Sequence, residues 1–346
     1  MMTQHTRSLN SNIIFIIGAL GGLLFGFDTG VISGASSLIE SSLRLTITET
    51  SFVTSAVLIG SCIGALGVGG LADRFGRKPL LFMASIFFII GALMSAFAPD
   101  FGIMILARII LGLAVGSASA LTPAYLAELA PTERRGSLQT LFQLMITLGI
   151  LVAYFINIAF LGHNILGWSD WRWMLGTAVI PALALFMGSL ILPESPRYLV
   201  RAGKKELSHK VLIRLRPEYT SEQINSELQD IENADAKAHK GGIKELFTIG
   251  KAPLIAAIGL MFFQQLVGIN SVIYYLPQVF IKGFHLSDSI SIWISVGIGT
   301  VNFLSTILAT KIMDKFPRKK LLIWGALVMG FSLGIITIIN YTVNIE

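Results

Sequence analysis

Two short stretches of the chain read almost alike: Asp-Arg-Phe-Gly-Arg-Lys-Pro-Leu-Leu at residues 73–81 and Asp-Lys-Phe-Pro-Arg-Lys-Lys-Leu-Leu at residues 314–322. Each follows one long apolar run and precedes another, and their first residues are 241 positions apart (314 minus 73). The same offset carries position 28, in the first apolar run, to position 269 in a later one. Apolar segments that recur at a fixed offset are typical of membrane proteins built from duplicated halves. The repeat therefore predicts two related helical bundles.

The composition independently predicts a membrane protein. Hydrophobic residues make up 53% of the 346 positions, charged residues 13%, and the mean hydropathy is +0.73. Because an ordinary globular chain is about 25% charged, this chain has too few charged side chains to build a soluble surface. The single cysteine, Cys62, excludes a disulfide framework and a cysteine-cluster metal site. We expect an all-α membrane protein.

Nine runs are apolar enough to be membrane spans, since about 20 such residues cross a bilayer core as a helix. They are 13–33, 51–71, 80–97, 101–127, 138–160, 171–192, 253–280, 289–313 and 320–340. Most Lys and Arg lie in the even-numbered loops, which predicts that these loops and the N-terminus face the cytoplasm. The net charge of +6 reflects this topology, and no basic-aromatic pattern predicts a nucleic-acid partner. We expect a multi-pass protein of the cell membrane.

The spans divide the chain into an N-terminal six-helix bundle at 1–192, a cytoplasmic linker at 193–252 and a second bundle at 253–346. The linker is polar and basic, and amphipathic patterns at 204–216 and 221–240 predict two short helices. Spans seven to nine repeat spans one to three, so the offset would carry spans four to six to positions 342–433. Because the chain ends at position 346, we expect nine of twelve spans, with the second bundle half complete.

Short motifs along most of the chain mark a family. Residues 69–78, Gly-Gly-Leu-Ala-Asp-Arg-Phe-Gly-Arg-Lys, resemble the signature loop of the major facilitator superfamily, and residues 193–197, Pro-Glu-Ser-Pro-Arg, resemble a mark of its sugar porter branch. Further matches to that branch are Glu128 with Arg135-Gly136, and Gln264-Gln265 with Gly268-Ile269-Asn270. Within the branch, the chain resembles bacterial D-xylose–proton symporters. The resemblance implies the major facilitator fold and sugar transport by alternating access.

The chain departs from the family pattern in two ways. Pro317 stands where the second signature loop usually has glycine, which we expect to weaken that loop modestly. From the resemblance and the repeat offset, we expect the family's last three helices, with a Trp-containing segment of the sugar site, to be missing from residues 1–346.

Asp28 and Arg108 are the only ionisable residues (Asp, Glu, Lys, Arg or His) well inside a predicted span. A lone charge there costs about 2.5–3.5 kcal/mol on insertion scales, so each needs a partner or a water-filled cavity. Span one runs outward and Asp28 lies several residues before its outer end. Span four runs inward and Arg108 lies about seven residues, or about 10 Å, below its outer start. We therefore expect the two side chains at similar depths in the outer half of the membrane, where they could pair. The pair is either a static bridge or a proton switch in which protonated Asp28 releases Arg108. The resemblance favours the switch, because sugar–proton symporters carry an acidic residue here and uniporting relatives a neutral one.

Sugar recognition needs amides, which donate and accept hydrogen bonds, and aromatic surfaces. From the polar residues within the spans, and by matching to the porters that the chain resembles, we predict sugar contacts at Gln143, Gln264, Gln265, Asn270, Tyr274 and Asn302. Gly268 would allow a helix break that turns several amides toward one cavity. For any single amide, the favoured explanation is an interhelical hydrogen bond, which is worth about 0.6 kcal/mol on average. The combination of Gln264, Gln265 and Asn270 favours a sugar.

Charged residues at the cytoplasmic helix ends predict a gating latch. An Asp at one helix end and basic residues before the next helix pair with each other and with helix ends. The positive-inside rule explains the basic residues but not Asp73 and Asp314. Together with the family motifs, the predicted latch comprises Asp73, Arg74, Arg77, Glu128, Arg135, Glu194, Arg197, Asp314 and Arg318.

The sequence shows no pattern typical of an enzyme. The five histidines lie in the tail or in loops without metal-ligand spacing, and no nucleophile accompanies a base. The glycine-rich stretch 18–34 predicts a close-packing helix face. We expect a monomer in the lipid bilayer that binds a monosaccharide, a pentose or a hexose, and uses the proton as coupling ion without a cofactor. Two alternatives stay open: a facilitator without proton coupling, and a sugar-sensing or truncated remnant that does not transport and binds sugar weakly or not at all.

Overall fold

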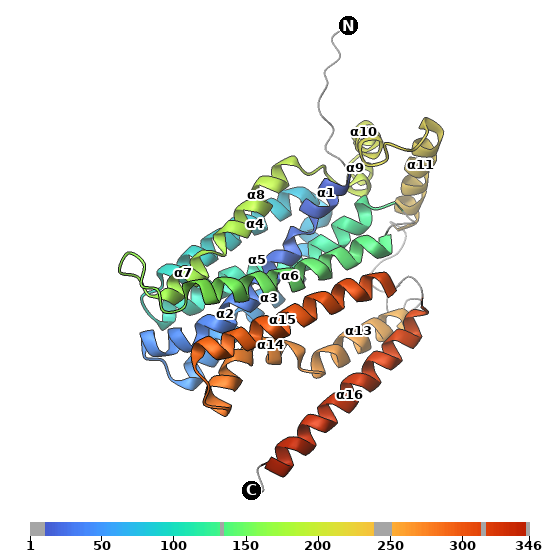
Figure 1. Ribbon diagram of the computed structural model, residues 1–346. Helices are drawn as coiled ribbons and strands as arrows, with labels where there is room; N and C mark the ends of the chain where they lie inside the picture. Colours follow the sequence, from blue (N-terminus) through green and yellow to red (C-terminus); the bar gives the residue numbers. More distant parts are fainter. Residues whose placement is uncertain (1–10, 132–134, 239–250, 313–315, 344–346) are drawn as a thin grey trace. The chain divides into compact units, whose positions relative to one another are not determined.

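The computed structural model describes residues 11–131, 135–238, 251–312 and 316–343 (Figure 1). Its helices in chain order are α1 (Ser11–Gly18), α2 (Leu20–Leu43), α3 (Ile47–Phe75), α4 (Arg77–Phe97), α5 (Phe101–Leu129), α6 (Arg135–Phe160), α7 (Asp170–Gly176), α8 (Val179–Ile191), α9 (Pro196–Arg201), α10 (Lys205–Leu215), α11 (Ser221–Ala238), α13 (Lys251–Leu266), α14 (Ile269–Gln278), the π-helix η2 (Val279–Gly283), α15 (Asp288–Ile312) and α16 (Arg318–Val343). The chain forms two compact units, residues 1–303 and residues 304–346.

Eight helical stretches among the described residues are long and apolar enough to cross a membrane, and they coincide with the first eight predicted spans. Span one is longer than predicted, because α2 continues past residue 33 to Leu43. Its last residues include serines and a glutamate, which lower the hydropathy without ending a helix. The helix ends where Arg44 adopts a left-handed conformation, with φ 53°, a common helix C-terminus.

The second unit holds the end of α15 and the whole of α16. Pro317 comes directly before α16, and its carbonyl accepts a hydrogen bond from the backbone N–H of Lys320 at 2.9 Å. α16 is 26 residues long and coincides with the ninth predicted span. Because many of its last side chains are outside the described residues, its membrane crossing stays a prediction.

Close glycine contacts hold the first bundle together. On α2, a side chain at Gly26 would overlap the backbone of Ile146 on α6, and a side chain at Gly149 would overlap the carbonyl of Leu23. Gly21, Gly22, Gly30 and Gly34 are in similarly tight contact with α5 or α6, and a side chain at Gly18 would lie 3.1 Å from Leu126 on α5. The predicted close-packing face of the first span is therefore confirmed, and it lets α2 approach its neighbours without intervening side chains.

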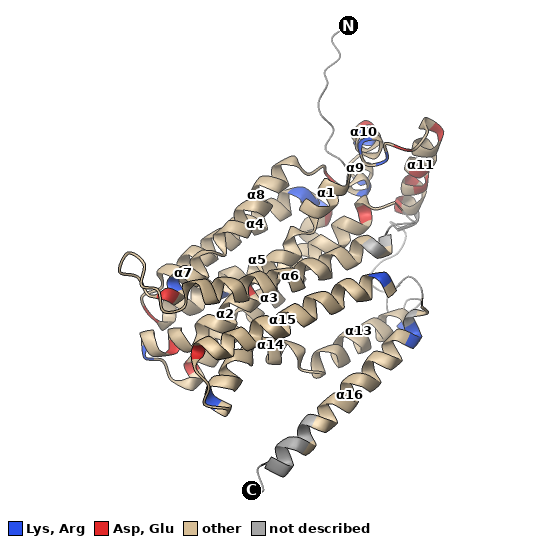
Figure 2. Cartoon of the chain, viewed as in Figure 1, with Lys and Arg blue, Asp and Glu red and all other residues tan. Residues whose placement is uncertain are grey.

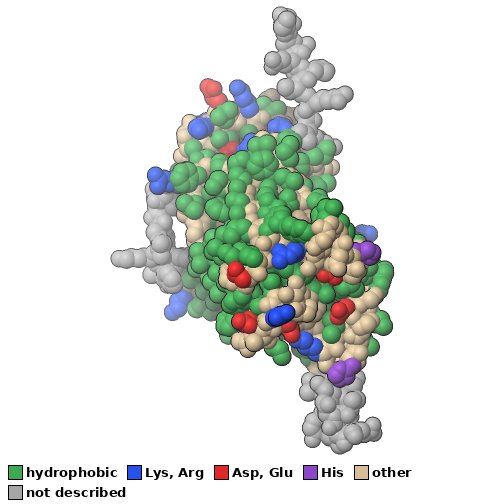
Figure 3. All heavy atoms as spheres, turned by 90° about the vertical axis from the view of Figure 1, so that its left-hand side faces the viewer, with side chains coloured by type: hydrophobic (Ala, Val, Ile, Leu, Met, Phe, Trp, Pro, Cys, Tyr) green, Lys and Arg blue, Asp and Glu red, His purple; other side chains and the backbone are tan. Residues whose placement is uncertain are grey.

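Charged residues lie toward the ends of helices such as α4 and α6, and the middle stretches of α4, α6 and α8 contain none (Figure 2). Large hydrophobic side chains are exposed instead, including Leu66 at 80% and Ile180 at 67%. On the face drawn in Figure 3, hydrophobic side chains cover wide areas between a few charged ones. Exposed apolar area of this extent indicates a surface that faces lipid.

Two linker helices, α10 and α11, coincide with the two amphipathic patterns, although residues 239–240 of the second are outside the described range. Arg216, at the end of α10, attaches this layer to the bundle. Its Nη1 donates to the carbonyl of Leu129 at the end of α5 at 2.8 Å, and its Nη2 donates to Glu227 of α11 at 3.0 Å. The linker helices are therefore held against the predicted cytoplasmic end of α5.

Candidate functional site

Asp28 on α2 and Arg108 on α5 form an ion pair in the interior of the first bundle. Nη1 of Arg108 donates to Oδ1 of Asp28, and Nη2 donates to Oδ2 at 3.2 Å, so the contact is bidentate. The Arg108 side chain is 0% exposed and the Asp28 side chain 2%. Since no water reaches either charge, each depends on the other for neutralisation. The predicted pairing is confirmed, whereas its role in proton coupling stays a prediction.

Tyr274 on α14 connects this ion pair to span seven. Its side chain is buried with only 5% of the residue exposed, and it lies beside Thr29 and within electrostatic range of both Asp28 and Arg108. The Nε of Arg108 is buried without a hydrogen-bond partner, although most buried polar side-chain atoms have one. The predicted proton residue and one predicted sugar contact are thus close together.

The helix of span seven breaks where Gly268 predicted it. α13 ends at Leu266, Gly268 has φ 78°, and α14 begins at Ile269. Glycine favours this left-handed conformation because it has no Cβ. At the break, Nδ2 of Asn270 donates to Oε1 of Gln265 at 2.8 Å. Two of the predicted sugar amides are therefore side by side.

The other predicted sugar contacts lie on separate helices. Gln143 is exposed on α6, Gln264 is exposed near the end of α13, and Asn302 is half-buried on α15. Helices α6, α14 and α15 meet in one apolar cluster that includes Tyr154, Val296 and Ile273. The three helices that carry most of the predicted contacts are therefore neighbours, although no hydrogen bond among the described residues joins Gln143 or Gln264 to Asn270.

At the predicted cytoplasmic end, Arg77 joins the ends of three helices. Its Nη2 is 2.9 Å from Glu128 on α5 and 3.4 Å from Asp73 on α3. Its Nη1 donates to the carbonyl of Ala72 at 3.0 Å. The signature loop is thereby fastened to the end of span four, as the predicted latch requires.

Glu194, which lies between α8 and α9, caps the start of α4. Its carboxylate accepts the backbone N–H of Arg77 at 2.9 Å, that of Lys78 at 3.3 Å and that of Ser195 at 2.8 Å. The first N–H groups of a helix have no partner within the helix, and a carboxylate there also interacts favourably with the helix dipole. At Gly76, with φ 95°, a side chain would overlap this carboxylate.

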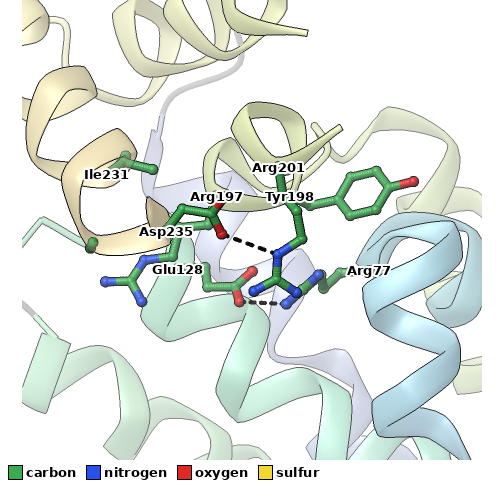
Figure 4. Close-up of a pocket in the computed structure, with 8 residues that line it drawn as sticks. Arg77, Glu128, Arg197, Tyr198, Arg201, Ile231 and Asp235 are labelled. Carbon is green, nitrogen blue, oxygen red and sulfur yellow. Dashed lines mark hydrogen bonds and ion pairs between the residues drawn. The ribbon is translucent and has the colours of Figure 1, made fainter. Parts of the chain in front are cut away.

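The linker contributes two charged residues that the sequence did not predict for the latch. Arg201 of α9 lies 2.7 Å from Asp73 and 3.2 Å from Asp235 of α11, and the latter contact is drawn in Figure 4. Burial alone disfavours the charged guanidinium, but the hydrogen bonds and negative charges of Asp235 and Asp73 outweigh it and raise the pKa of Arg201. The basic linker was recognisable, but not which of its arginines reaches Asp73.

The remaining predicted latch residues differ in their surroundings. Arg74 is exposed, and its guanidinium lies over the ring of Phe75, 5.2 Å from the centroid. Arg197 lines a pocket of about 120 Å³ with Arg77, Glu128 and Arg201, and in Figure 4 its guanidinium points away from the Arg77–Glu128 pair. Three predicted members are outside the described residues or have side chains outside them: Arg135, Asp314 and Arg318.

Within the described part of the chain, no group of three or more His, Cys, Asp or Glu residues could hold a metal ion. The charged residues at both sites are instead arranged as ion pairs between helices.

A family model described as "Sugar (and other) transporter" matches residues 14–345. The chain belongs to this sugar transporter family. The transporter is 47% identical over 334 residues to the D-xylose transporter of Levilactobacillus brevis, a match that covers 96% of this chain and 71% of that relative. It is 38% identical over 337 residues to the galactose-proton symporter of Escherichia coli strain K12, covering 96% and 71%.

The structure of this sugar transporter also resembles a solved one. The major facilitator superfamily proton:xylose symporter XylE, bound to 6-bromo-6-deoxy-D-glucose, matches with a TM-score of 0.81 and 33% sequence identity, over 90% of this chain and 70% of that one. The transporter is therefore an all-helical, multi-pass membrane protein with the major facilitator fold. It spans about seven tenths of the length of these relatives.

Proposed function

We propose that this transporter carries a monosaccharide, D-xylose or a related pentose or hexose, across the cell membrane together with a proton. The observation that carries the proposal is the buried, bidentate Asp28–Arg108 pair beside Tyr274 of span seven. Among the residues that the structure describes, Asp28 is the one fully buried Asp or Glu, and its carboxylate can take up a proton. The similarity to a D-xylose transporter and to a galactose-proton symporter supports both sugar and proton as substrates.

Protonation of Asp28 would remove the charge that neutralises Arg108. The guanidinium would then be a buried cation with no carboxylate, an arrangement several kcal/mol less stable. The bundle relieves this by a movement that gives Arg108 water or another acceptor. Proton binding is thereby coupled to a displacement of α2 against α5, which is the requirement for a proton-driven change of access.

The sugar would bind at the break in span seven, between the amides predicted above. Gln265 and Asn270 are already paired there, and Gln264, Gln143, Tyr274 and Asn302 come from the same and neighbouring helices. Each amide both donates and accepts hydrogen bonds, so the set suits a ring of hydroxyls. At the predicted cytoplasmic end, Arg77 and its carboxylate partners would hold one access state and release it in the other.

The finer features of the topology belong to the same proposal. We infer a cytoplasmic N-terminus from the distribution of Lys and Arg, and nine spans, six in the first bundle and three in residues 253–346. The transporter would work as a monomer, with the proton as coupling ion and no cofactor.

A second candidate, facilitated sugar transport without a proton, is favoured by one observation. The Asp28–Arg108 pair is complete and enclosed, as a static structural bridge would be. The two candidates differ in whether sugar is concentrated against its gradient when only a proton gradient is supplied.

Uptake of labelled D-xylose and D-glucose into proteoliposomes tests the proposal. With an inward proton gradient we expect accumulation above the external concentration, and without the gradient equilibration only. Equilibration under both conditions would support the facilitator, and no sugar entry at all would support a protein that binds without transporting. For the sugar site, Gln143→Leu should raise the KM for sugar about tenfold, as the loss of one hydrogen bond would. Gln139→Leu, also exposed but not among the predicted sugar contacts, should leave the KM unchanged.

A further inference from the structure

The outer ends of spans one and seven are joined by polar contacts that the proposed function does not use. Here the outer end means the end predicted to face away from the cytoplasm. Nζ of Lys282 on η2 lies 3.0 Å from both carboxylate oxygens of Glu40 on α2. One turn deeper, Nε2 of Gln278 donates to Oγ of Ser36 at 2.9 Å. These contacts close the space between the two spans above the Asp28–Arg108 pair.

The contacts belong to two facing polar stripes. On α2, Thr29, Ser33, Ser36 and Glu40 follow one another at intervals of four, three and four residues, which places them on one face of the helix. The opposite stripe is Tyr274, Gln278 and Lys282, at intervals of four. Glu40 is twelve residues beyond Asp28, about 18 Å along the helix at 1.5 Å per residue. The seam therefore runs from the buried ion pair to the outer surface.

The paired residues occupy almost equivalent positions in the two halves of the repeat. Glu40 and Lys282 are 242 residues apart, as are Ser36 and Gln278, and the repeat offset is 241. Equivalent positions of two parallel repeats approach each other only near the axis that relates the repeats. Contacts beside this axis must change when one half rocks against the other, so they are well placed to bias that motion.

We propose that Glu40 and Lys282 are positioning residues that form an outer latch, closing the path to Asp28 and to the sugar site from the outside. The latch rests on the proposed function, because it assumes that access alternates. It must part each time the path opens outward and re-form each time it closes.

The exposure of the pair suits this role. The Lys282 side chain is 45% exposed and that of Glu40 22%, so water can replace the contact when it breaks. An ion pair of this kind shifts an equilibrium by about two- to fivefold. Such a weak latch favours the closed outer end without locking it.

Chemical labelling at the seam tests the latch without any transport measurement. Ser33→Cys, introduced after the chain's one cysteine is removed by Cys62→Ser, places a thiol on the seam at a position that is 1% exposed. An impermeant maleimide added outside should label this thiol only while the outer end is open. We expect Glu40→Gln and Lys282→Gln each to speed labelling about two- to fivefold. The charge swap Glu40→Lys with Lys282→Glu should restore the slow rate.

Two controls isolate the ion pair. Arg44→Gln removes another exposed charge at the same end, and should leave the labelling rate unchanged. Added salt should speed labelling of the protein with both charges but not of Lys282→Gln. Unchanged labelling in both single variants, or fast labelling in the charge swap, would overturn the latch.

The experiment separates the latch from the proposed function. If labelling follows the expected pattern but a proton gradient drives no sugar accumulation, the latch stands and the proton coupling fails. If accumulation is normal but the single variants label at the original rate, the proposed function stands and the latch fails.

Discussion

The Asp28–Arg108 pair and the Arg201–Asp73 contact, at the edge of the network around Arg77, use the same carboxylate–guanidinium chemistry in opposite surroundings. In the first, the side chains are 0% and 2% exposed. In the second, Asp73 is 57% exposed and its partner Arg201 34%. A buried pair changes state only when a proton or a new partner arrives, because no water replaces the lost contact. The exposed Arg201 contact can be replaced by water, so it suits a latch that opens in every cycle.

The largest effect should come from breaking the buried pair on one side. Arg108→Gln leaves the Asp28 carboxylate buried without a cation, and we expect it to lower the free energy of unfolding by about 3–5 kcal/mol. Asp28→Asn combined with Arg108→Gln leaves no charge and should recover most of this loss. Thermal unfolding of the purified protein in detergent measures both. Equal losses in the single and double variants would show that the uncompensated charge is not the cause.

A smaller effect should follow from the cap of α4. Glu194→Gln weakens the hydrogen bonds from Arg77, Lys78 and Ser195 by removing the acceptor's charge, and should cost about 1.5–3 kcal/mol. Glu206→Gln, an exposed substitution on α10, is the matched control and should stay within about 0.5 kcal/mol. The same unfolding measurement compares them, and indistinguishable stabilities would contradict the capping role.

The exposed network should show the smallest effect and the strongest response to salt. Arg201→Gln removes the contacts to Asp73 and Asp235 and should cost less than about 1 kcal/mol. At an ionic strength of about 1 M the difference from the unmodified protein should vanish. Lys210→Gln, on the exposed surface of α10, should show no such salt-dependent difference. A loss at Arg201 that persists in high salt would mean that the network is effectively buried.

The pH dependence of the same variant has a defined sign. Folding raises the pKa of Arg201. The stabilisation from the charged Arg201 is therefore fully present below the pKa that Arg201 has in the unfolded chain, and it is lost only as the pH rises through the higher pKa of the folded protein. The difference between Arg201→Gln and the unmodified protein should therefore be constant from about pH 6 to 9. Unfolding scans at intervals across this range check it, and a difference that declines toward pH 9 would contradict the assignment.

The sequence predicted features that depend on the position of a residue within its own helix. It often did not predict contacts that depend on how two helices pack against each other. The depth of Asp28 and Arg108 within their spans predicted their pairing, and Gly268 predicted the break in span seven. The Arg201–Asp235 contact depends on how α9 packs against α11, which no periodicity specifies. The Glu40–Lys282 pair was missed because α2 continues as a helix beyond the apolar run that defined span one. The repeat offset could have indicated this pair, because Glu40 and Lys282 are 242 residues apart. Nearly equivalent positions of the two repeats can meet beside the axis that relates the repeats.

Sugar-induced proton movement tests the central claim most directly. Proteoliposomes in weakly buffered medium are given D-xylose without any imposed gradient, and the external pH is recorded. The unmodified protein should make the medium more alkaline as sugar enters. Asp28→Asn should abolish the pH change while still exchanging labelled sugar across the membrane, and Asp100→Asn, at the start of α5, should behave as the unmodified protein. An undiminished pH change in Asp28→Asn would contradict the assignment of Asp28 as the proton carrier.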